Sequence, residues 1–360
     1  MALTLEEAYS RASLSLRRKM EHSVELLRKA EKLALAYDAE DGFFLAFSGG
    51  KDSQALYHMA QLAGVRFKAH FSPTSVDPPA VIRFIRKCYP DVEFLKLKES
   101  IYSIAIRKGL LPTRTVRWCC DELKEHTGAG KVTLIGIRKA ESSRRNKRNE
   151  VEMSSRKFSG DMDGFEAWRK EKVIPSVANP DAIDSESVTG CIKGKDSLLV
   201  SPIIYWDDKD VWEFLNDVLR VEHCELYDRG YNRIGCICCP MSTYRQKLRE
   251  LRDFPQVKRN WIKAIKAIRK GGGVFQQDYI WWNIRSNPNL ISKIGGGQQH
   301  RNYLDRCYPF SDSPSLVGTE EDRENKIAEN IFDWWISGKA YEKWYAEKYL
   351  QGKFDFFANE

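Results

Sequence analysis

The chain has 360 residues, of which 42% are hydrophobic and 12% aromatic, and its mean hydropathy is −0.51. This length suggests two or three domains, each able to bury its own core. No apolar run approaches the roughly 20 residues of a membrane helix, and charges interrupt the apolar runs of the N-terminal stretch MALTLEEAYSRASLSLRRKM. We therefore expect a cytoplasmic protein with no membrane partner. The formal net charge of +8 favours polyanionic partners.

The chain begins with helical periodicity and then changes to a strand. Residues 4–37 predict one or two helices, because apolar residues recur there at helical spacing. FFLAF (43–47) is a short, fully apolar run ended by Gly-Gly, which predicts a buried strand. QALYHMAQLAG (54–64) predicts a helix with a glycine stop. The order is therefore strand, tight turn, helix.

The alternation of strands and helices continues beyond residue 64. We expect a strand at 66–71, then a helix in VDPPAVIRFIRKCY that is capped by Asp77 and has Pro78 at its first position. VEFLKL and KVTLIGI predict two more strands. Strands that alternate with helices imply parallel pairing, hence an α/β fold with an open, mostly parallel, doubly wound sheet of Rossmann-like type. The ligand of such a sheet binds at the carboxyl ends of its strands.

The rest of the chain is less regular. Residues 140–200 are polar and predict an insertion that ends in a hairpin, VTGCIKGKDSLLVSPI, and helices dominate beyond residue 205, with glycine clusters at 271–273 and 295–297 as joints. We expect three parts. They are an N-terminal helical segment (1–40), a nucleotide-binding domain with the insertion and a cysteine cluster (41–241), and a mostly α-helical C-terminal subdomain (242–360).

The turn after FFLAF has the character of a phosphate-binding loop, although it lacks the Gly-x-x-x-x-Gly-Lys-Ser/Thr spacing of the common nucleotide-triphosphatase loop. Backbone N–H groups and the positive end of the following helix would surround one anion, and the serine hydroxyls could donate to phosphate oxygens. Lys51 adds a positive charge, and Asp52 would act through a bound metal or by fixing the loop. The alternative is a capped helix after a strand. The loop consists of Ser48, Gly49, Gly50, Lys51, Asp52 and Ser53.

This loop resembles the PP-loop of the adenine-nucleotide α-hydrolase group, and specifically of the phosphoadenosine-phosphosulfate (PAPS) reductase family. Four further blocks similar to that family follow in order, so that the resemblance covers residues 43–241. The blocks are TRTVRWCCDELK, LIGIRKAESSRR, SPIIYWDDKDVWEFL and LYDRGYNRIGCICCP. ATP-using relatives release pyrophosphate after attack at the α-phosphate, whereas the reductases accommodate a sulfonucleotide in the same pocket.

The resemblance also implies site residues and cofactors. Lys51 and Asp52 would be the catalytic residues, with ATP and Mg²⁺ as cofactors. Thr74, Gly136 and Arg138 would contact the nucleotide. By the same analogy, a polar wall beside the phosphates or the substrate would be formed by Glu141, Ser142 and Arg145.

Five of the nine cysteines are clustered in two places. Two thiolates from each place can close a four-cysteine cage around a [4Fe-4S] cluster, with zinc and reduced structural thiols as the alternatives. The candidate ligands are Cys119, Cys120, Cys236 and Cys239. Similarity to adenosine-phosphosulfate (APS) reductases, which pair a Cys-Cys with a later Cys-x-x-Cys, favours the iron-sulfur cluster. Cys238 has no clear role, and Cys224 is a backup ligand.

The resemblance to the reductases is incomplete. Their nucleophilic cysteine lies in a segment Glu-Cys-Gly-Leu-His, which does not occur in this sequence. We therefore expect an ATP pyrophosphatase that adenylylates an acceptor for sulfur insertion, resembling the PP-loop component of DNA phosphorothioation systems, with tRNA thiolation as a close variant. A cysteine desulfurase would donate the sulfur. The alternatives are an APS or PAPS reductase and a non-catalytic nucleotide-binding regulator.

Basic residues are candidates for holding a nucleic-acid backbone, with DNA favoured over tRNA. The candidates are Arg144, Arg145, Lys147 and Arg148, together with SKIGGGQQHRN (292–302). A solvated, mobile loop is the alternative for the first group. The sequence leaves the oligomeric state open.

Overall fold

The computed structural model describes residues 3–172, 192, 194–270, 319–339, 344 and 347. The chain forms two compact units, and neither unit is a continuous segment. The first unit consists of Met1–Pro73, Asp77–Leu97 and Asp121–Gly235. The second unit consists of Thr74–Val76, Lys98–Cys120 and Cys236–Glu360.

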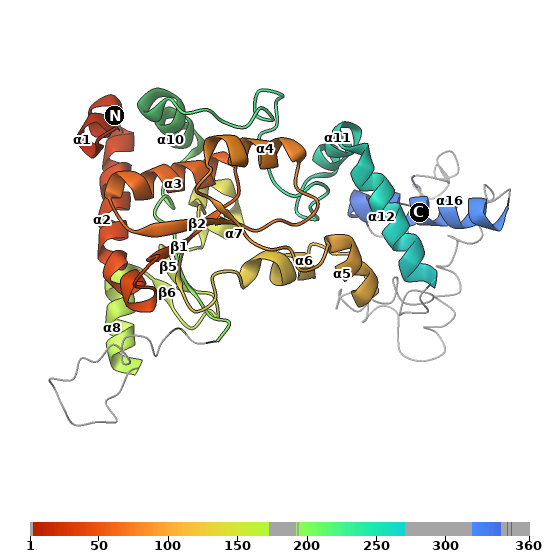
Figure 1. The fold of residues 1–360 in the computed structure, drawn as a ribbon, viewed down its shortest axis with the longest axis horizontal. Helices are drawn as coiled ribbons and strands as arrows, with labels where there is room; N and C mark the ends of the chain where they lie inside the picture. The colour runs from red at the N-terminus through yellow and green to blue at the C-terminus, as the bar shows by residue number, and fades with distance from the viewer. Residues whose placement is uncertain are drawn as a thin grey trace, which may run out of the picture. The chain divides into compact units, whose positions relative to one another are not determined.

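The first unit is built on a seven-stranded sheet with the order β3-β2-β1-β4-β7-β5-β6 (Figure 1). The strands are β1 (Phe43–Phe47), β2 (Phe67–Phe71), β3 (Glu93–Phe94), β4 (Val132–Leu134), β5 (Val151–Met153), β6 (Ser159–Gly160) and β7 (Leu198–Val200). The pairs from β3 to β7 are parallel, and β5 and β6 add an antiparallel edge. The predicted α/β class with an open, mostly parallel sheet is confirmed.

Helices flank this sheet (Figure 1). The helices of the first unit are α1 (Leu5–Arg11), α2 (Leu14–Tyr37), α3 (Lys51–Ala63), α4 (Pro79–Cys88), α7 (Ser143–Asn146), α8 (Met162–Lys172) and α10 (Asp208–Trp212), with the short helical segments η1 (Asp121–Glu125), η2 (Lys139–Glu141) and η3 (Glu213–Leu219). The apolar stripe of α2 is buried at Leu27, Ala30 and Ala34, and α2 packs against α3, β1 and β4. Burial of this stripe explains the helical periodicity of residues 4–37.

Two local predictions were wrong. Helix α4 begins at Pro79 and its N-cap is Pro78, so Asp77 does not cap it. A proline fits the first helical position because its missing N–H would have no partner there. The apolar run at 198–200 is not a hairpin arm, because it is strand β7, parallel to β4 and antiparallel to β5. Residues 188–191, the start of the predicted hairpin, lie outside the described residues.

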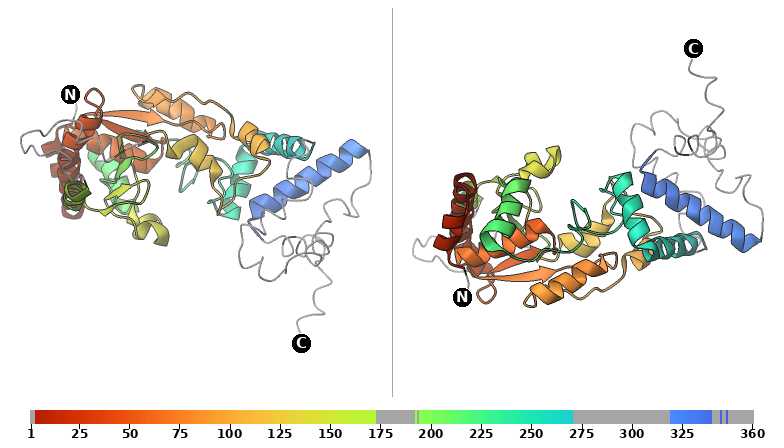
Figure 2. Two further views of the ribbon diagram at one scale, coloured as in Figure 1. Left: turned by 90° about the horizontal axis from the view of Figure 1, so that it is seen from below. Right: turned by 90° about the horizontal axis from the view of Figure 1, so that it is seen from above.

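The second unit is helical in its described part. Its helices are α5 (Ile101–Lys108), α6 (Trp118–Cys120), α11 (Tyr244–Asp253), α12 (Pro255–Lys270) and α16 (Glu320–Ser337). Trp261 of α12 is buried between two rings, with centroids 5.0 Å from Tyr102 and 4.9 Å from Trp335. Helix α16 packs against α12 (Figure 2). The glycine clusters at 271–273 and 295–297 lie outside the described residues.

None of the helices in the described part of the chain combines the length and the apolar character that crossing a bilayer requires.

Candidate nucleotide-binding site

Three neighbouring parallel strands of the first unit end at the candidate site. The phosphate loop follows β1, Gly136 and Arg138 follow β4, and Asp208 follows β7. Strand β1 lies between β2 and β4, so the strand order changes direction at β1. Open α/β sheets bind their ligands at this kind of switch point, outside the carboxyl ends of the strands.

A cavity of about 140 Å³ lies at these strand ends. It is lined by Ala46, Ser48, Gly50, Lys51, Asp52, Ser53, Gly136, Glu141, Arg145, Tyr227, Arg233 and Ile234. The structure thus brings six of the predicted nucleotide-contacting residues to one pocket, namely Ser48, Gly50, Lys51, Asp52, Ser53 and Gly136. The lining has three basic side chains, Lys51, Arg145 and Arg233, and two acidic ones, Asp52 and Glu141, so that it is basic on balance. This balance suits a polyanionic ligand.

The loop conformation depends on its serines and glycines. Ser53 Oγ donates to the Gly50 carbonyl at 2.8 Å and accepts from the Ser48 N–H at 3.1 Å. Gly49 has a φ of +72°, and a Cβ there would lie 2.9 Å from Val81 Cγ1 of α4. Only glycine fits both conditions. The loop is therefore held in one shape before any ligand binds.

A close approach of backbones brings the end of β4 to the start of α3. A Cβ at Gly136 would lie 3.0 Å from the Asp52 carbonyl oxygen and 3.3 Å from the Ser53 nitrogen. The glycine at this position lets the two segments form one wall of the pocket.

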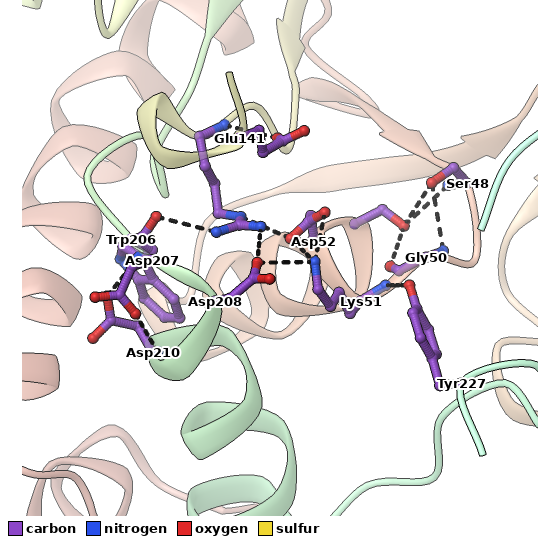
Figure 3. A network of polar contacts seen from close by, with 12 residues as sticks. Ser48, Gly50, Lys51, Asp52, Glu141, Trp206, Asp207, Asp208, Asp210 and Tyr227 are labelled. Carbon is purple, nitrogen blue, oxygen red and sulfur yellow. Dashed lines mark hydrogen bonds and ion pairs between the residues drawn. The ribbon is translucent and has the colours of Figure 1, made fainter. Parts of the chain in front are cut away.

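A network of two basic and two acidic side chains lies beside the loop (Figure 3). Arg138, whose residue is 2% exposed, donates from Nε to Asp52 Oδ1 at 2.7 Å and from a terminal nitrogen to Asp208 Oδ1 at 2.5 Å. Lys51 Nζ lies 3.2 Å from Asp52 Oδ1 and 3.2 Å from Asp208 Oδ1. A second terminal nitrogen of Arg138 donates to the Trp206 carbonyl at 3.3 Å. The network holds Lys51 and Asp52 at fixed positions.

Several pKa values in the site are shifted. Although the Asp208 side chain is 69% exposed, partial desolvation alone would raise its pKa, but the charges of Lys51 and Arg138 and their hydrogen bonds hold this pKa below its usual value. Burial lowers the pKa of Arg145 to about 10, so this guanidinium stays charged at neutral pH. Burial also raises the pKa of Tyr227, whose hydroxyl accepts the Lys51 backbone N–H at 2.8 Å. At pH 7 the Tyr227 hydroxyl is therefore neutral, and it contacts the first residue of α3, Lys51.

Sequence reasoning did not single out Asp208, Tyr227 and Arg233. Asp208 lies in the block SPIIYWDDKDVWEFL, and the other two lie in LYDRGYNRIGCICCP. In the sequence, the similarity of these blocks to the family was the available indication of the three residues, because no local spacing connects the residues to the loop at 48–53.

Thr74 belongs to the second unit. Its residue is 2% exposed, and its hydroxyl lies 3.4 Å from Cys236 Sγ. The predicted role of Thr74 in nucleotide binding stays a prediction.

All four candidate metal ligands belong to the second unit. A hydrogen bond with Cys120, burial, and the charges of Cys120, Cys236 and Cys239 together raise the pKa of Cys119, so these sulfurs lie within electrostatic reach of one another. Arg117 donates to Cys120 Sγ at 2.9 Å. Four gathered thiols fit the donor set of a [4Fe-4S] cluster or zinc.

The four sulfurs are near one another but do not have the geometry of a metal site. Among the residues that the structure describes, no three His, Cys, Asp or Glu side chains form a metal-binding group. Charges act over longer distances than metal–ligand bonds, so Cys236 and Cys239 can raise the pKa of Cys119 although the four sulfurs do not form one metal-binding group. The [4Fe-4S] assignment therefore stays a prediction that rests on the donor set.

A buried carboxylate supports the loop that carries Cys236 and Cys239. Cys238 has a φ of +59°, and its N–H donates to Glu250 Oε2 of α11 at 2.7 Å. Glu250 Oε1 accepts from Gln246 Nε2 at 2.8 Å. Cys238 is buried, so the structure gives this cysteine a packing position rather than a place at the surface.

The basic residues predicted to hold nucleic acid divide into two groups. Arg145 pairs with Glu141 and lines the pocket, and Arg148 pairs with Glu152. Arg144 and Lys147 are exposed. Residues 292–302 lie outside the described residues.

The fold and the loop define the class of α/β domains in which a phosphate loop follows the first strand at a switch point. Residues 42–242 match the model of the phosphoadenosine phosphosulfate reductase domain. The chain belongs to this family, as its sequence motifs predicted.

Curated relatives and solved structures extend the comparison. An uncharacterized protein of Methanocaldococcus jannaschii is 27% identical over 263 residues, covering 69% of this chain and 53% of that protein. A second uncharacterized protein of the same organism is 21% identical over 234 residues, covering 62% of this chain and 41% of that protein. The chain thus spans about half the length, or less, of these relatives.

Adenosine 5'-phosphosulfate reductase of Oceanobacillus iheyensis is 46% identical over 82 residues, which are 22% of this chain and 31% of that enzyme. Among solved structures, FMN adenylyltransferase of Candida glabrata superposes with a TM-score of 0.36 at 15% identity, covering 66% of this chain and 72% of that chain.

Proposed function

We propose that the protein is a PP-loop ATP pyrophosphatase that adenylylates an acceptor for sulfur transfer, as in DNA phosphorothioation. The observation that carries this proposal is the pocket at the ends of β1, β4 and β7, where the phosphate loop, Gly136, Arg145 and Arg233 meet. Membership in the phosphoadenosine phosphosulfate reductase domain family supports an adenine nucleotide as the ligand.

The proposed reaction transfers the adenylyl group. An acceptor oxygen attacks the α-phosphorus of ATP, the bond from that phosphorus to the bridging oxygen breaks, and pyrophosphate leaves. The loop N–H groups and the serine hydroxyls hold the pyrophosphate portion, while Lys51 and Arg145 balance its charge. Asp52 fixes the loop through Arg138, and Mg²⁺ would accompany the nucleotide as a further counter-charge.

Sulfur then replaces the adenylylated oxygen. Adenylylation makes that oxygen a good leaving group, so a sulfur nucleophile can displace AMP. A cysteine desulfurase is the proposed donor of a persulfide, whose terminal sulfur attacks the acceptor and displaces AMP. A second thiol then attacks the carrier sulfur, so the S–S bond breaks, the two thiols form a disulfide, and the terminal sulfur stays on the acceptor. The acceptor is nucleic acid, with DNA favoured over tRNA. A [4Fe-4S] cluster on Cys119, Cys120, Cys236 and Cys239 would supply bound sulfur or electrons when present.

An APS or PAPS reductase is the second candidate. The partial similarity to adenosine 5'-phosphosulfate reductase favours it, and the same pocket would then hold a sulfonucleotide. The two candidates differ in the bond that breaks, since a reductase leaves the α-phosphorus of its nucleotide untouched.

The deciding experiment incubates the anaerobically isolated protein with Mg²⁺ and ATP, with and without DNA or tRNA, and separates AMP and pyrophosphate from ADP and phosphate. We expect AMP and pyrophosphate, which Lys51→Ala and Asp52→Ala abolish. Lys68→Ala, which removes a half-exposed lysine of β2 outside the pocket, is the matched control and keeps the activity. Absence of ATP turnover together with tight binding of APS or PAPS would establish the reductase instead.

A further inference from the structure

The positive charge of the chain is concentrated in two consecutive helices of the second unit. Residues 244–270, which form α11 and α12, contain ten Lys or Arg residues and two Asp or Glu residues. Their formal excess of +8 equals that of the whole chain, so the remaining residues are balanced. Of the ten, Lys247 is buried, Lys258 pairs with Asp333, and Arg269 pairs with Glu324. The other seven leave a basic excess of the kind that favours polyanionic partners.

Helix α12 presents a basic stripe opposite its core face. Its buried residues are Val257, Trp261, Ala264, Ile265 and Ile268. Arg259, Lys263, Lys266 and Lys270 follow one another at spacings of four, three and four residues and therefore lie on one side of the helix. Arg259, Lys263 and Lys270 are exposed. The stripe spans about 16 Å at 1.5 Å per residue.

Helix α11 repeats this pattern on a shorter scale. Arg245, Arg249 and Arg252 share one side of the helix, whereas Lys247 and Glu250 are buried on the other. The exposed ring of Tyr244 stands next to Arg245 in the chain. An exposed aromatic ring beside arginines can stack on a base.

The acidic residues of this segment do not neutralise the α12 stripe. Glu250 is engaged with the Cys238 N–H and with Gln246, and Asp253 pairs with Arg252. On the stripe, Lys266 Nζ donates to Asn325 Oδ1 of α16 at 2.6 Å, and the charges of Lys266 and Lys270 help to lower the pKa of Glu324. Arg259 and Lys263, which are exposed, are thus the charges of the stripe that are most open to a partner.

We propose that the α11–α12 face, defined by Tyr244, Arg245, Arg249, Arg252, Arg259, Lys263, Lys266 and Lys270, binds the sugar-phosphate backbone of the nucleic-acid acceptor. This inference deepens the proposed function and rests on it for the identity of the acceptor. A stripe of about 16 Å can meet several phosphates, since duplex DNA carries one charge per about 1.7 Å of axis. The exposed Tyr244 favours nucleic acid over an anionic membrane, because a base can stack on it.

The test measures binding by fluorescence anisotropy with labelled single-stranded DNA, duplex DNA and RNA of one sequence, at several salt concentrations, using the full chain. The stripe variant is Arg259→Gln/Lys263→Gln, and a second variant, Arg245→Gln/Lys270→Gln, removes two other charges of the face. The matched control is Arg17→Gln/Lys29→Gln on α2, where two half-exposed basic residues pair with Glu21 and Glu25. Unchanged thermal midpoints verify folding.

We expect each face variant to bind the preferred nucleic acid about tenfold or more weakly, with the slope of log K against log salt reduced by about 2, while the control keeps both values. The tightest of the three ligands identifies the acceptor class. The proposal is overturned if the face variants bind like the control, or if vesicles with phosphatidylserine are bound while all three nucleic acids are not.

The same samples separate this inference from the proposed function. If the wild-type protein makes AMP from ATP and the face variants are stimulated by nucleic acid as strongly as the wild type, the face proposal fails and the pyrophosphatase stands. If nucleic-acid binding depends on the face but ATP is never cleaved, the pyrophosphatase proposal fails and the face stands as a nucleic-acid site of another activity.

Discussion

Arg138 and Asp52 lie 86 residues apart in the chain and are joined by a hydrogen bond of 2.7 Å from Nε to Oδ1. This contact connects the end of β4 to the first turn of α3, where the phosphate loop ends. Because the same guanidinium contacts Asp208 and the Trp206 carbonyl, one buried side chain links three strand ends. The pocket is therefore organised by Arg138 before a nucleotide enters.

Replacing this side chain tests that role. Arg138→Met leaves Asp52 and Asp208 with Lys51 as their shared cation, so we expect a loss of about 1–3 kcal/mol in the free energy of unfolding, below the value for a fully buried pair because Asp208 is exposed. AMP formation should fall at least about tenfold. Urea unfolding and product separation measure the two effects.

The control is Arg148→Met, which removes an arginine that pairs with Glu152 four residues away and does not line the pocket. Its cost should stay at or below about 0.5 kcal/mol. Equal losses in the two variants would contradict the assigned role of Arg138.

The phosphate loop can be tested through its backbone. Gly49→Ala places a methyl group in a left-handed conformation and against Val81 and Ile85, whereas Gly64→Ala has the same kind of φ, +71°, with nothing within 4 Å. We expect Gly64→Ala to cost about 1 kcal/mol and Gly49→Ala about 1–3 kcal/mol more, from the added overpacking. Thermal unfolding measures the two losses of stability, and nucleotide titration measures their effect on binding. If Gly49→Ala and Gly64→Ala have the same unfolding midpoint, the steric argument is wrong.

A histidine of α3, His58, predicts a pH dependence of stability. Burial lowers the pKa of His58 from 6.5 to about 4 in the folded chain, where its ring contacts Gln61 and the Tyr89 hydroxyl. Between pH 6.5 and pH 4 the unfolded chain therefore binds a proton that the folded chain does not, so stability falls as the pH falls through this window. The loss amounts to about 3 kcal/mol at most.

His58→Gln should remove this part of the pH dependence, because glutamine does not titrate. Chemical unfolding at several pH values between 7 and 4 measures it. If the wild type and the variant lose stability in parallel over this range, His58 is not the responsible group.

The support beneath the Cys-x-x-Cys loop gives a prediction about metal content. Glu250→Ala removes the acceptor of the Cys238 N–H, so we expect the loop to loosen, the stability to fall by about 1–3 kcal/mol, and iron and sulfide per chain to decrease after anaerobic isolation. Glu321→Gln, an exposed change on α16, is the control and keeps the wild-type iron content. Cys236→Ala should abolish iron and visible absorbance, and a wild-type chain without either would refute the cluster.

The sequence predicted the parts of the site that are local. FFLAF corresponds residue by residue to β1, because a strand buried on both faces of a parallel sheet is a continuous apolar run. The turn after it contains all the residues of the phosphate loop. The signal for both is complete within eleven residues of one segment, 43–53.

The remaining parts depend on strand pairing over long distances. Asp208 reaches the loop because the three-residue strand β7 pairs with β4, and a run as short as Leu198–Val200 does not reveal its partner. Strands β5 and β6 lie in a polar stretch without strand periodicity. Burial of Val151 and Met153 accounts for β5, and pairing with β5 at the sheet edge accounts for β6. Tyr227 is placed by a chain segment without regular structure.

The division of the second unit among separated stretches has a consequence for synthesis. All residues of the first unit have been synthesised once the ribosome has passed Gly235, so this unit can fold before the rest of the second unit is made. Tyr102, which packs on Trp261, and Pro112, which accepts from Trp335 Nε1, are made more than a hundred residues before their partners. The segment that carries Cys119 and Cys120 therefore lacks its packing partners Trp261 and Trp335 until α12 and α16 have been synthesised. We therefore expect the four thiols to come together only after α12 and α16 have been made.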